Sequence, residues 1–351
     1  MREFNYSKIR DRKWDSELLS LIGAIYKEAG KQELYLRQKP EALEKLVEIA
    51  KVQSTEASNA IEGIVTTDTR IRQLVEQKTT PRNRNEQEIA GYRDVLEIIH
   101  ESFDAIPITQ NYILQLHKIL YSHMYNPVAG KTKTVQNYIS ATYPDGHVET
   151  LFTPVAPYET PGALDSLCEE YNRVIGNMEL DPLIAIPIFI HDFLCIHPFN
   201  DGNGRMSRLL TLLLLYQSDY IVGKYISIEK IIEESKETYY EVLQDSSLNW
   251  HENENDYKPF VNYMLGVIVN AYKEFESRVE LVTNPNLSKS DRIREIIKNH
   301  IGTITKAELL EMNPDISDTT VQRTLAELLK NNEIKKIGGG RYTKYTWNVE
   351  D

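Results

Sequence analysis

The feature that most limits how this chain can fold is a polar loop held between two strongly apolar segments. Residues 182–196 end in LIAIPIFIHDFLCI, and residues 203–218 contain RLLTLLLLY. Segments of this length that are apolar almost all round predict helices buried in a protein core. The loop at 197–208 is therefore expected to be held rigidly at both ends, which is typical of catalytic loops. The chain as a whole shows helical periodicity and predicts a mainly α fold.

The second half of this loop has the composition of a phosphate-binding site. Gly202 and Gly204 lack a Cβ atom, so the backbone amides beside them can approach an anion closely. The next helix begins there, and the N-terminus of a helix attracts negative charge. Arg205 and Arg208 are three residues apart and therefore share one helical face, where two guanidinium groups can clamp phosphates.

The first half of the loop supplies groups for proton transfer and metal binding. The ordinary pKa of histidine is roughly 6.5, so His197 is mostly neutral near neutral pH and can accept a proton from a hydroxyl group. Asp201 is a candidate Mg²⁺ ligand, because Mg²⁺ takes one or two carboxylates together with phosphate oxygens and water. A plain turn between helices would need neither the histidine nor the paired arginines. We therefore predict a polyphosphate site beside a general base.

The loop sequence HPFNDGNGRMSR resembles the Fic family motif H-x-F-x-[D/E]-G-N-G-R-x-x-R at every fixed position. The resemblance extends to His191 and Ile196 before the loop and covers roughly residues 40–275. Enzymes of this family transfer AMP from ATP to a Ser, Thr or Tyr hydroxyl of a protein. The resemblance therefore implies a Fic helical fold with a β-hairpin flap, protein AMPylation including self-AMPylation, ATP as the substrate and Mg²⁺ as the cofactor.

The resemblance also implies a role for each loop residue. His197 would be the catalytic base and Asp201 the metal ligand. The anion hole would be formed by Gly202, Asn203 and Gly204. The β- and γ-phosphates would be held by Arg205 and Arg208. The phosphotransferase branch of the family departs from the motif at the glycine positions. Because both glycines are kept here, nucleotidyl transfer is favoured over phosphorylation.

Residues 130–157 differ from the rest of the chain, because they are rich in Thr, Tyr, Val and Phe and contain a Pro-Asp-Gly turn at 144–146. This pattern predicts a β-hairpin inserted in a helical body. In the Fic family such a flap orders the target segment by main-chain pairing, and the resemblance puts it at 135–142, with Ile139 and Ser140. Ser140 stands where a glycine is common, which leaves the backbone shape of the flap open.

Tyr239 has two interpretations. It resembles a tyrosine that lies near the adenine in relatives, and it fits equally well as an aromatic residue packed inside a helix. Ser247 stands where those relatives have an asparagine, which leaves the adenosine pocket open.

Upstream, the sequence SNAIEG at 58–63 resembles the inhibitory motif [S/T]-x-x-x-E-[G/N] of the same family. It ends a helix predicted at about 43–63, with Gly63 suited to the helix C-terminus. Ser58 and Glu62 share one helical face, from which the carboxylate could pair with Arg208 and exclude the γ-phosphate. A differential of about 2.7 kcal/mol would suppress activity roughly 100-fold. Two alternatives stay open: Glu62 is a solvated residue near a helix end, or it positions a water that removes AMP from a modified protein, as in some relatives.

From residue 288 the pattern changes to three short helices and a strand pair at 333–337 and 342–348, joined by three glycines. This order predicts a small α+β winged-helix domain, and its 11 Lys or Arg against 10 Asp or Glu leave it near neutral. The basic residues expected on the wing are Lys335, Lys336, Arg341 and Lys344. The third helix, capped by Ser317, would expose Thr319, Thr320, Gln322 and Arg323. A DNA-binding module and a protein-docking or dimerisation module both fit this pattern.

We therefore expect an N-terminal helical region at 1–100, a Fic catalytic core at 101–282, a linker at 283–287 and a winged helix at 288–351. The chain has 40 basic and 52 acidic residues and a net charge of −12, so any DNA contact must come from a local patch. Its two cysteines exclude a disulfide framework and a four-cysteine zinc site. The charged N-terminus is not a secretory signal and no apolar run spans a bilayer, so a cytoplasmic protein without membrane contact is expected.

The leading hypothesis is an autoinhibited AMP transferase that acts on protein hydroxyls. One rival is a hydrolase that chiefly removes AMP through Glu62, and the other is a DNA-binding regulator whose Fic domain only senses a nucleotide. The sequence leaves open the target protein, the choice of nucleotide and whether the chain forms a homo-oligomer. It also leaves open which of the 21 tyrosines would be a self-modification site.

Overall fold

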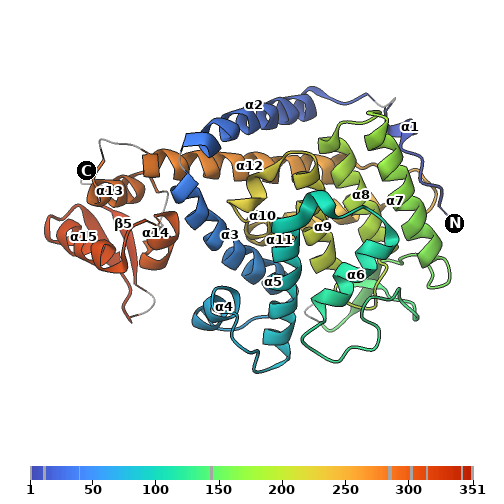
Figure 1. Cartoon of the computed structure of the whole chain (residues 1–351), viewed down its shortest axis with the longest axis horizontal. Helices are drawn as coiled ribbons and strands as arrows, with labels where there is room; N and C mark the ends of the chain where they lie inside the picture. The colour runs from blue at the N-terminus through green and yellow to red at the C-terminus, as the bar shows by residue number, and fades with distance from the viewer. Residues whose placement is uncertain are drawn as a thin grey trace. The chain divides into compact units, whose positions relative to one another are not determined.

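The computed structural model describes residues 2–10, 13–38, 40–142, 145–283, 287–300, 303–313, 315–340 and 343–348. These residues are mainly helical with two small antiparallel sheets, so the predicted mainly α fold class is confirmed (Figure 1). The chain forms two compact units. The larger unit contains Met1–Ala29 and Ala50–Ala271, and the smaller unit contains Gly30–Ile49 and Tyr272–Asp351.

Most of the helices belong to the larger unit. They are α1 (Ser7–Arg10), α4 (Asp68–Val75), α5 (Arg84–Ser102), α6 (Gln110–Leu120), α7 (Thr160–Gly176), α8 (Pro182–Ile196), α9 (Asn203–Gln217), α10 (Ile228–Glu234) and α11 (Lys236–Ser247), with short 3₁₀ helices at Phe103–Ala105 and Ile221–Lys224. Three long helices contribute residues to both units, namely α2 (Ser16–Gln38), α3 (Pro40–Ile61) and α12 (Lys258–Thr283).

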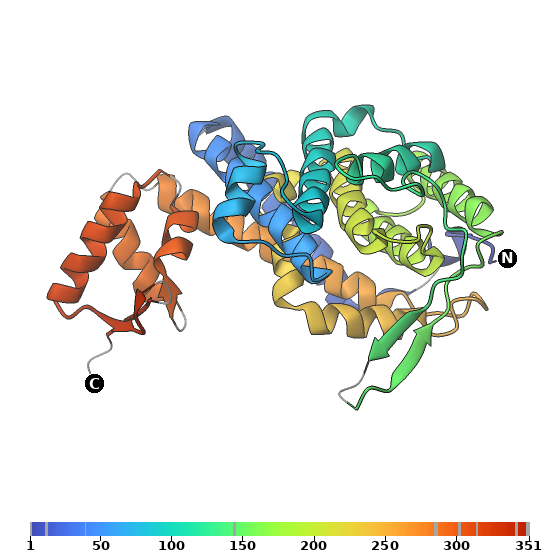
Figure 2. The same ribbon diagram turned by 90° about the horizontal axis from the view of Figure 1, so that it is seen from below.

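The two apolar segments of the sequence form α8 and α9, which pack against each other in the core of the larger unit (Figures 1 and 2). Nearly all of their side chains are buried. Asp181 caps α8, because its carboxylate accepts a hydrogen bond from the Leu183 N–H at 2.8 Å. α7 packs on α8, and α5 packs on α9. The loop between α8 and α9 is thus held at both ends by buried helices.

The predicted hairpin is formed by β1 (Ile139–Thr142) and β2 (Val148–Phe152), which pair antiparallel and project from the larger unit (Figure 2). The register shifts between Ile139 and Ser140, so β2 contains one extra residue there. Ser140 does not have a positive φ, and its backbone conformation therefore does not require glycine. Pro144 of the predicted turn lies outside the described residues.

In the smaller unit, the predicted three helices and strand pair are present as α13 (Lys289–Asn299), α14 (Lys306–Met312), α15 (Asp318–Lys330), β4 (Ile334–Ile337) and β5 (Lys344–Trp347). An additional short strand, β3 (Ile304–Thr305), pairs with β5, and the strand order is β3-β5-β4. Ser317 caps α15 as expected, since its hydroxyl accepts from the Thr320 N–H at 3.3 Å. Residues 284–286 of the predicted linker and Arg341 of the predicted wing lie outside the described residues.

Three short helices, α1, α4 and α10, were not expected from the sequence. α4 is stabilised by tertiary contacts, because Ile71 and Leu74 pack with Ile89 of α5. Arg70 of α4 also forms a buried ion pair with Glu86 at 2.7 Å. A helix of eight residues has about two turns, which is too short for its periodicity to stand out in the sequence.

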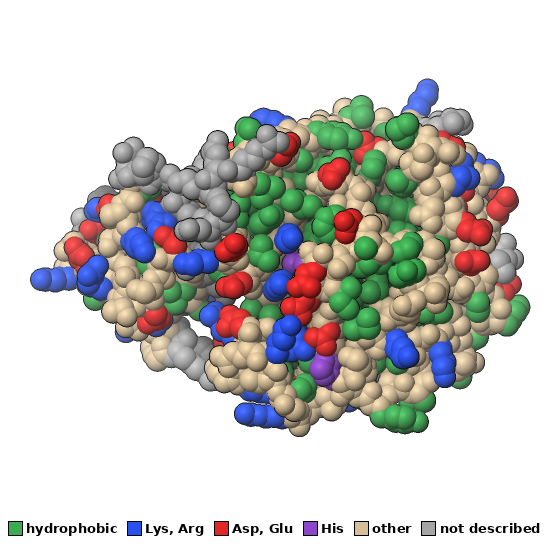
Figure 3. Space-filling view, in the orientation of Figure 1, with side chains coloured by type: hydrophobic (Ala, Val, Ile, Leu, Met, Phe, Trp, Pro, Cys, Tyr) green, Lys and Arg blue, Asp and Glu red, His purple; other side chains and the backbone are tan. Residues whose placement is uncertain are grey.

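On the face of the larger unit that Figure 3 shows, hydrophobic side chains gather over the middle, with charged side chains around and between them. Within the described ranges, every helix is too short or too polar to cross a membrane.

Candidate functional site

His197 directly follows α8 and has a left-handed backbone conformation, with φ 52° and ψ 62°. Its Nδ1–H donates to the Leu194 carbonyl at 3.2 Å, because a carbonyl oxygen can only accept. This bond leaves Nε2 as the unprotonated nitrogen. Burial lowers the pKa of His197 to about 4, although the bond to Leu194 acts in the opposite direction. The imidazole is therefore neutral near pH 7 and can accept a proton at Nε2.

The glycine turn after His197 is tightly packed. Gly202 has a φ of 85° and precedes the first residue of α9. A Cβ atom at Gly202 would lie 3.0 Å from the Tyr121 hydroxyl oxygen. Asn203 is buried, and its side chain donates to the Phe199 carbonyl at 2.8 Å while accepting from the Phe199 N–H at 2.9 Å. The Asn203 side chain thus links the start of α9 to the backbone of Phe199 within the same loop.

Arg208 lies on the second turn of α9 and is bound by the end of α3. Its Nε donates to the Ser58 hydroxyl at 2.8 Å, and its Nη2 donates to the Ser58 carbonyl at 2.9 Å and to Glu62 Oε1 at 2.7 Å. The Arg208 side chain is 3% exposed and the Glu62 side chain 33%. The structure therefore pairs Glu62 with Arg208, as the resemblance to the family motif predicted, and adds Ser58 as a second partner of the guanidinium group.

The end of α3 is itself held in place by two features. Gly63 has a φ of 76° and follows the last turn, as expected of a residue that terminates a helix. Lys236 of α11 donates from Nζ to the Ile61 carbonyl at 2.6 Å. A cation at the C-terminus of a helix is favourable, so Lys236 stabilises the turn from which Glu62 extends.

Gly204 lies against the Glu62 carboxylate. A Cβ atom at Gly204 would be 2.2 Å from Glu62 Oε1 and 3.1 Å from Glu62 Cδ. The carboxylate thus occupies the space at the N-terminus of α9 that Gly204 leaves open because it has no side chain. This is the position where a helix N-terminus binds an anion, so a carboxylate of the chain stands where a phosphate group would be expected.

Arg205 has a different partner, which the sequence did not indicate. Its side chain is 1% exposed, and its Nη2 lies 2.8 Å from Glu88 Oε2 of α5 and donates to the Tyr121 hydroxyl at 2.9 Å. Its Nε and Nη1 are buried without a partner among the described residues. Arg205 and Arg208 therefore do not both face an open phosphate site as predicted, because Arg205 is paired with Glu88 of α5 and Arg208 with Glu62, just after α3.

Asp201 is exposed at the tip of the loop, with 57% of its side chain accessible. Its Oδ1 accepts from the Gly202 N–H at 2.7 Å, and its Oδ2 lies 3.9 Å from Arg205 Nη2. No cluster of three His, Cys, Asp or Glu residues that could hold a metal occurs within the described ranges. A single exposed carboxylate fits Mg²⁺ only when nucleotide phosphates and water supply the remaining ligands.

His117 of α6 supports the loop from the other side, and sequence reasoning missed it. Its ring stacks on Phe199 with a centroid distance of 3.7 Å and an interplanar angle of 1°. Nε2–H donates to the Asp201 carbonyl at 3.0 Å, and Nδ1 accepts from the Gly130 N–H at 3.0 Å. Burial lowers the pKa of His117 to about 4, so the ring is neutral in this arrangement. The only signal in the sequence was a histidine on the apolar face of a predicted helix.

α6 approaches α5 closely because Gly91 has no side chain. A Cβ atom at Gly91 would lie 1.9 Å from the Leu120 carbonyl oxygen, which is a backbone atom and cannot turn aside. The position of α6, and with it that of His117 and Tyr121, therefore depends on this glycine.

Tyr239 of α11 is 3% exposed and lies in a group of aromatic rings. Its ring centroid is 5.4 Å from that of Tyr240 and 6.1 Å from that of Phe260. Burial raises the pKa of Tyr239, and the Arg208 charge acts in the opposite direction. Tyr239 is thus both a packed aromatic residue and a close neighbour of Arg208, so both interpretations from the sequence stand. The Ser247 hydroxyl lies 3.2 Å from His191 Nε2.

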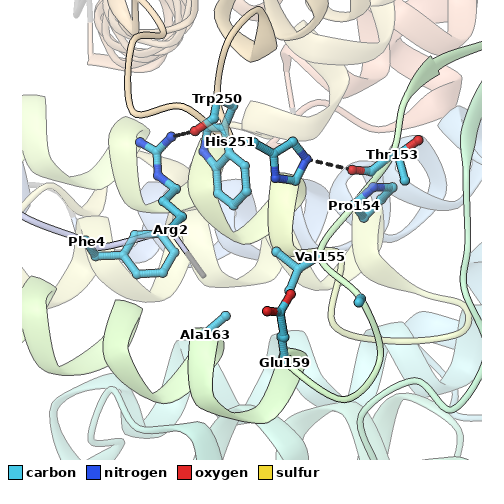
Figure 4. Close-up of a pocket in the computed structure, with 10 residues that line it drawn as sticks. Arg2, Phe4, Thr153, Pro154, Val155, Glu159, Ala163, Trp250 and His251 are labelled. Carbon is cyan, nitrogen blue, oxygen red and sulfur yellow. Dashed lines mark hydrogen bonds between the residues drawn. The ribbon is translucent and has the colours of Figure 1, made fainter.

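A separate pocket of about 310 Å³ lies beside the end of β2 (Figure 4). It is lined by Arg2, Phe4, Thr153, Glu159, Trp250 and His251, among others. In Figure 4, His251 reaches the Thr153 carbonyl, and the Arg2 guanidinium reaches the Trp250 carbonyl. No residue of the 197–208 loop lines this pocket, so it is distinct from the site around His197.

Comparison with known proteins places the loop within a family. The Fic/DOC family model matches residues 107–215. A protein adenylyltransferase Fic of Drosophila sechellia is 24% identical over 275 residues, which are 70% of this chain and 51% of that protein. A protein adenylyltransferase Fic of Nematostella vectensis is 26% identical over 219 residues, which are 59% of this chain and 44% of that protein. The chain thus spans about half the length of these relatives.

Solved structures support the fold. A Fic family protein from Desulfovibrio desulfuricans G20 aligns with a TM-score of 0.61 at 20% identity, over 97% of this chain and 98% of that one. A Fic domain containing signaling protein from Bacteroides thetaiotaomicron aligns with a TM-score of 0.58 at 23% identity, over 76% and 97%. The matched residues 107–215 include α6, α8, the complete loop and nearly all of α9. Residues 107–215 of this chain therefore match the Fic/DOC family model, and the solved structures share its fold.

Proposed function

We propose that this chain transfers AMP from ATP to a Ser, Thr or Tyr hydroxyl of a protein, and that Glu62 holds it in an autoinhibited state. The proposal is supported by the relatives named protein adenylyltransferase Fic, with which it shares 24–26% identity. It is also supported by the loop, which combines a neutral histidine, a helix N-terminus and a buried arginine within twelve residues.

In the proposed reaction, Nε2 of His197 accepts the proton of the target hydroxyl. The hydroxyl oxygen then forms a bond with the α-phosphorus of ATP, and the bond between this phosphorus and the bridging oxygen to the β-phosphate breaks, so pyrophosphate leaves. The N-terminus of α9 and the Arg208 guanidinium would hold the anionic phosphates. Asp201 would hold Mg²⁺, which neutralises charge on the phosphates when bound.

The observation that carries the proposal is the position of the Glu62 carboxylate. It lies against Gly204 and binds Arg208 at 2.7 Å, so it uses two of the groups that a polyphosphate would need. A γ-phosphate and this carboxylate would compete for the same guanidinium group. We therefore expect ATP to bind productively only after Glu62 leaves.

The test uses ATP labelled on the α-phosphate, with Mg²⁺ and cell lysate as a source of targets. Three proteins are compared: the native chain, Glu62→Gly, and Glu62→Gly with His197→Ala. We expect strong labelling of the chain itself or of a target with Glu62→Gly, weak labelling with the native chain and none with the double variant. Absence of label with all three would refute AMP transfer.

The same variants distinguish the hydrolase alternative. If Glu62 positions a water that removes AMP, the native chain would release AMP from a labelled protein and Glu62→Gly would not. A protein labelled by the Glu62→Gly variant, freed of that variant and then mixed with the native chain, provides the substrate. Release of label by the native chain would show that one site carries both activities.

A second candidate function, DNA binding, rests on the exposed start of α15. Gln322 and Arg323 are exposed, and Lys335, Lys336 and Lys344 are exposed on the strand pair. A helix N-terminus beside basic strands suits contact with a major groove and the phosphates next to it. Selection of bound sequences from a random DNA pool tests this function. Loss of selected binding in Arg323→Ala, with equal binding of unrelated DNA by both proteins, would support specific recognition.

A further inference from the structure

Lys133 is a buried cation that the proposed reaction does not use. It lies in the segment that leads into β1, and it is 2% exposed. Burial lowers the pKa of Lys133 to about 8. A buried ammonium group is unfavourable unless its protons are bonded. Here Nζ donates to Asn137 Oδ1 at 2.9 Å and to the Ile196 carbonyl at 3.0 Å.

The contacts of Lys133 lie on both sides of His197. Its backbone N–H donates to the Pro198 carbonyl at 2.8 Å, while its Nζ holds the Ile196 carbonyl. Asn137 adds a third hydrogen bond of this kind, because its side chain donates to the Phe199 carbonyl at 3.0 Å. Residues 133–137 therefore fasten the backbone immediately before and after the histidine.

These contacts explain how His197 keeps an uncommon backbone conformation. The last carbonyls of a helix lack partners within that helix, and a cation beside them is favourable. The Lys133 ammonium group serves this purpose at Ile196, the last residue of α8. A left-handed conformation at a residue other than glycine persists only when its surroundings hold it. Two fixed neighbouring carbonyls supply that restraint at His197.

We infer that Lys133 is a positioning residue that holds His197 in the orientation required for proton transfer. The inference rests on the proposed function of His197 as the base. Lys133 acts through the backbone and touches no reacting atom. Its charge has a second consequence, since it opposes protonation of His197, whereas the charges of Glu62 and Asp201 favour it.

The test compares two lysines that are two residues apart. Lys133→Met keeps the length of the side chain and removes its donors. Lys131→Met does the same at an exposed lysine whose side chain donates to the Pro127 carbonyl. Both are made in the Glu62→Gly background, so that release of the carboxylate does not limit the rate. We expect Lys133→Met to lower kcat by about 10- to 100-fold, with KM for ATP changed by less than about threefold.

Lys131→Met is expected to match its parent in both constants. Lys133→Arg, which keeps a positive charge and N–H donors, is expected to recover part of the lost kcat. A folded Lys133→Met protein with the kcat of its parent would overturn the inference. If Lys133→Met does not fold, Asn137→Ala replaces it, since this variant loses the bond to the Phe199 carbonyl without changing a buried charge. A kcat equal to the parent would then overturn the inference.

A second measurement does not depend on activity. The ring signals of His197 are assigned by nuclear magnetic resonance on histidine-labelled protein, with His197→Ala identifying the peak, and are followed from pH 7 to below pH 4, for as long as the protein stays folded. Loss of the Lys133 charge is expected to raise the pKa of His197, and Lys131→Met is expected to leave it unchanged. Identical titrations in the parent and Lys133→Met would contradict the inference. Absence of transferase activity in every protein would refute the proposed function alone, because this titration would still test Lys133.

Discussion

The two halves of the loop between α8 and α9 are held in different ways. In the half that begins at His197, backbone carbonyls are bound by donors from other parts of the larger unit, chiefly Lys133 and His117. In the half that begins at Gly202, the arginine side chains are bound by carboxylates, from Glu62 and Glu88. In the proposed reaction the base would thus already be in place, whereas the groups suited to phosphate are occupied by the protein's own anions. We therefore expect formation of the active state to require a change in the second half only.

The largest expected effect comes from removing the base. In the Glu62→Gly background, His197→Ala should lower label transfer by about 10²- to 10⁴-fold, because proton transfer by a positioned side chain contributes roughly this factor. The thermal midpoint should change little, since His197 is only partly buried at the loop. Transfer that survives undiminished would mean that another group takes the proton.

The next effect contrasts the two carboxylates. Glu62→Gly should raise transfer about 100-fold, which corresponds to about 2.7 kcal/mol. Glu88→Gln is the control: it should lower activity, because it leaves the buried Arg205 guanidinium without its ion pair. If both changes activated the protein to the same extent, the two carboxylates would have the same role and the contrast between them would fail. Initial rates with labelled ATP measure both variants.

Gly91→Ala tests how much the packing of α6 on α5, which supports the loop half that begins at His197, contributes to stability. The added Cβ would meet a backbone oxygen of α6 at 1.9 Å, so the two helices must separate. A loss of about 1–3 kcal/mol in the free energy of unfolding is expected, measured by urea unfolding. Gly23→Ala is a suitable control, because a Cβ there meets no atom within 4 Å.

Gly204→Ala makes the corresponding change in the loop half that begins at Gly202. Here the added Cβ would meet the Glu62 carboxylate, which is the end of a flexible side chain. The new Cβ should push the Glu62 carboxylate away from Arg208 and cost about 1 kcal/mol or less of stability. In the Glu62→Gly background this cost should disappear, because the obstructing atoms are gone. The four proteins form a cycle, and additivity of the two changes would show that the carboxylate does not lie against Gly204.

The last expected effect concerns pH. Burial lowers the pKa of His100 to about 3, and those of His117 and His197 to about 4. The folded values lie below the unfolded value of roughly 6.5, so the unfolded chain binds protons first as the pH falls. Stability from these residues is present above about pH 6.5 and is lost progressively towards pH 4. Urea unfolding between these limits measures the slope.

His117→Gln sharpens this measurement, because an amide keeps a donor for the Asp201 carbonyl but does not titrate. The slope of stability against pH should be smaller in this variant than in the native chain. An unchanged slope would mean that His117 is not neutral and buried as described.

The sequence was sufficient to locate the loop, because its chemical groups are contiguous and lie between helices that are apolar all round. It was also sufficient to predict that Ser58 and Glu62 share a face, since a regular helix fixes this, and the resemblance to the inhibitory motif predicted that Glu62 pairs with Arg208. The inhibitory role of this contact stays a prediction. The residues that support the loop could not be found in this way. Glu88 and His117 are single residues on two different helices, and Lys133 is a single residue in the loop before β1. His117 and Lys133 bind carbonyls whose directions depend on the tertiary fold.

Under the proposed function, the contact between Glu62 and Gly204 makes the end of α3 a tethered ligand of the phosphate site. A tethered group acts at an effective concentration that depends on how closely its attachment matches the distance to be spanned, and it reaches millimolar values for short linkers. Here the attachment is a helical turn that Lys236 fastens through the Ile61 carbonyl. Under the proposed function, ATP would therefore compete with this carboxylate, whose effective concentration at the site depends on how well ordered that turn is. Any contact that disorders this turn would lower the effective concentration of the Glu62 carboxylate without changing the loop itself.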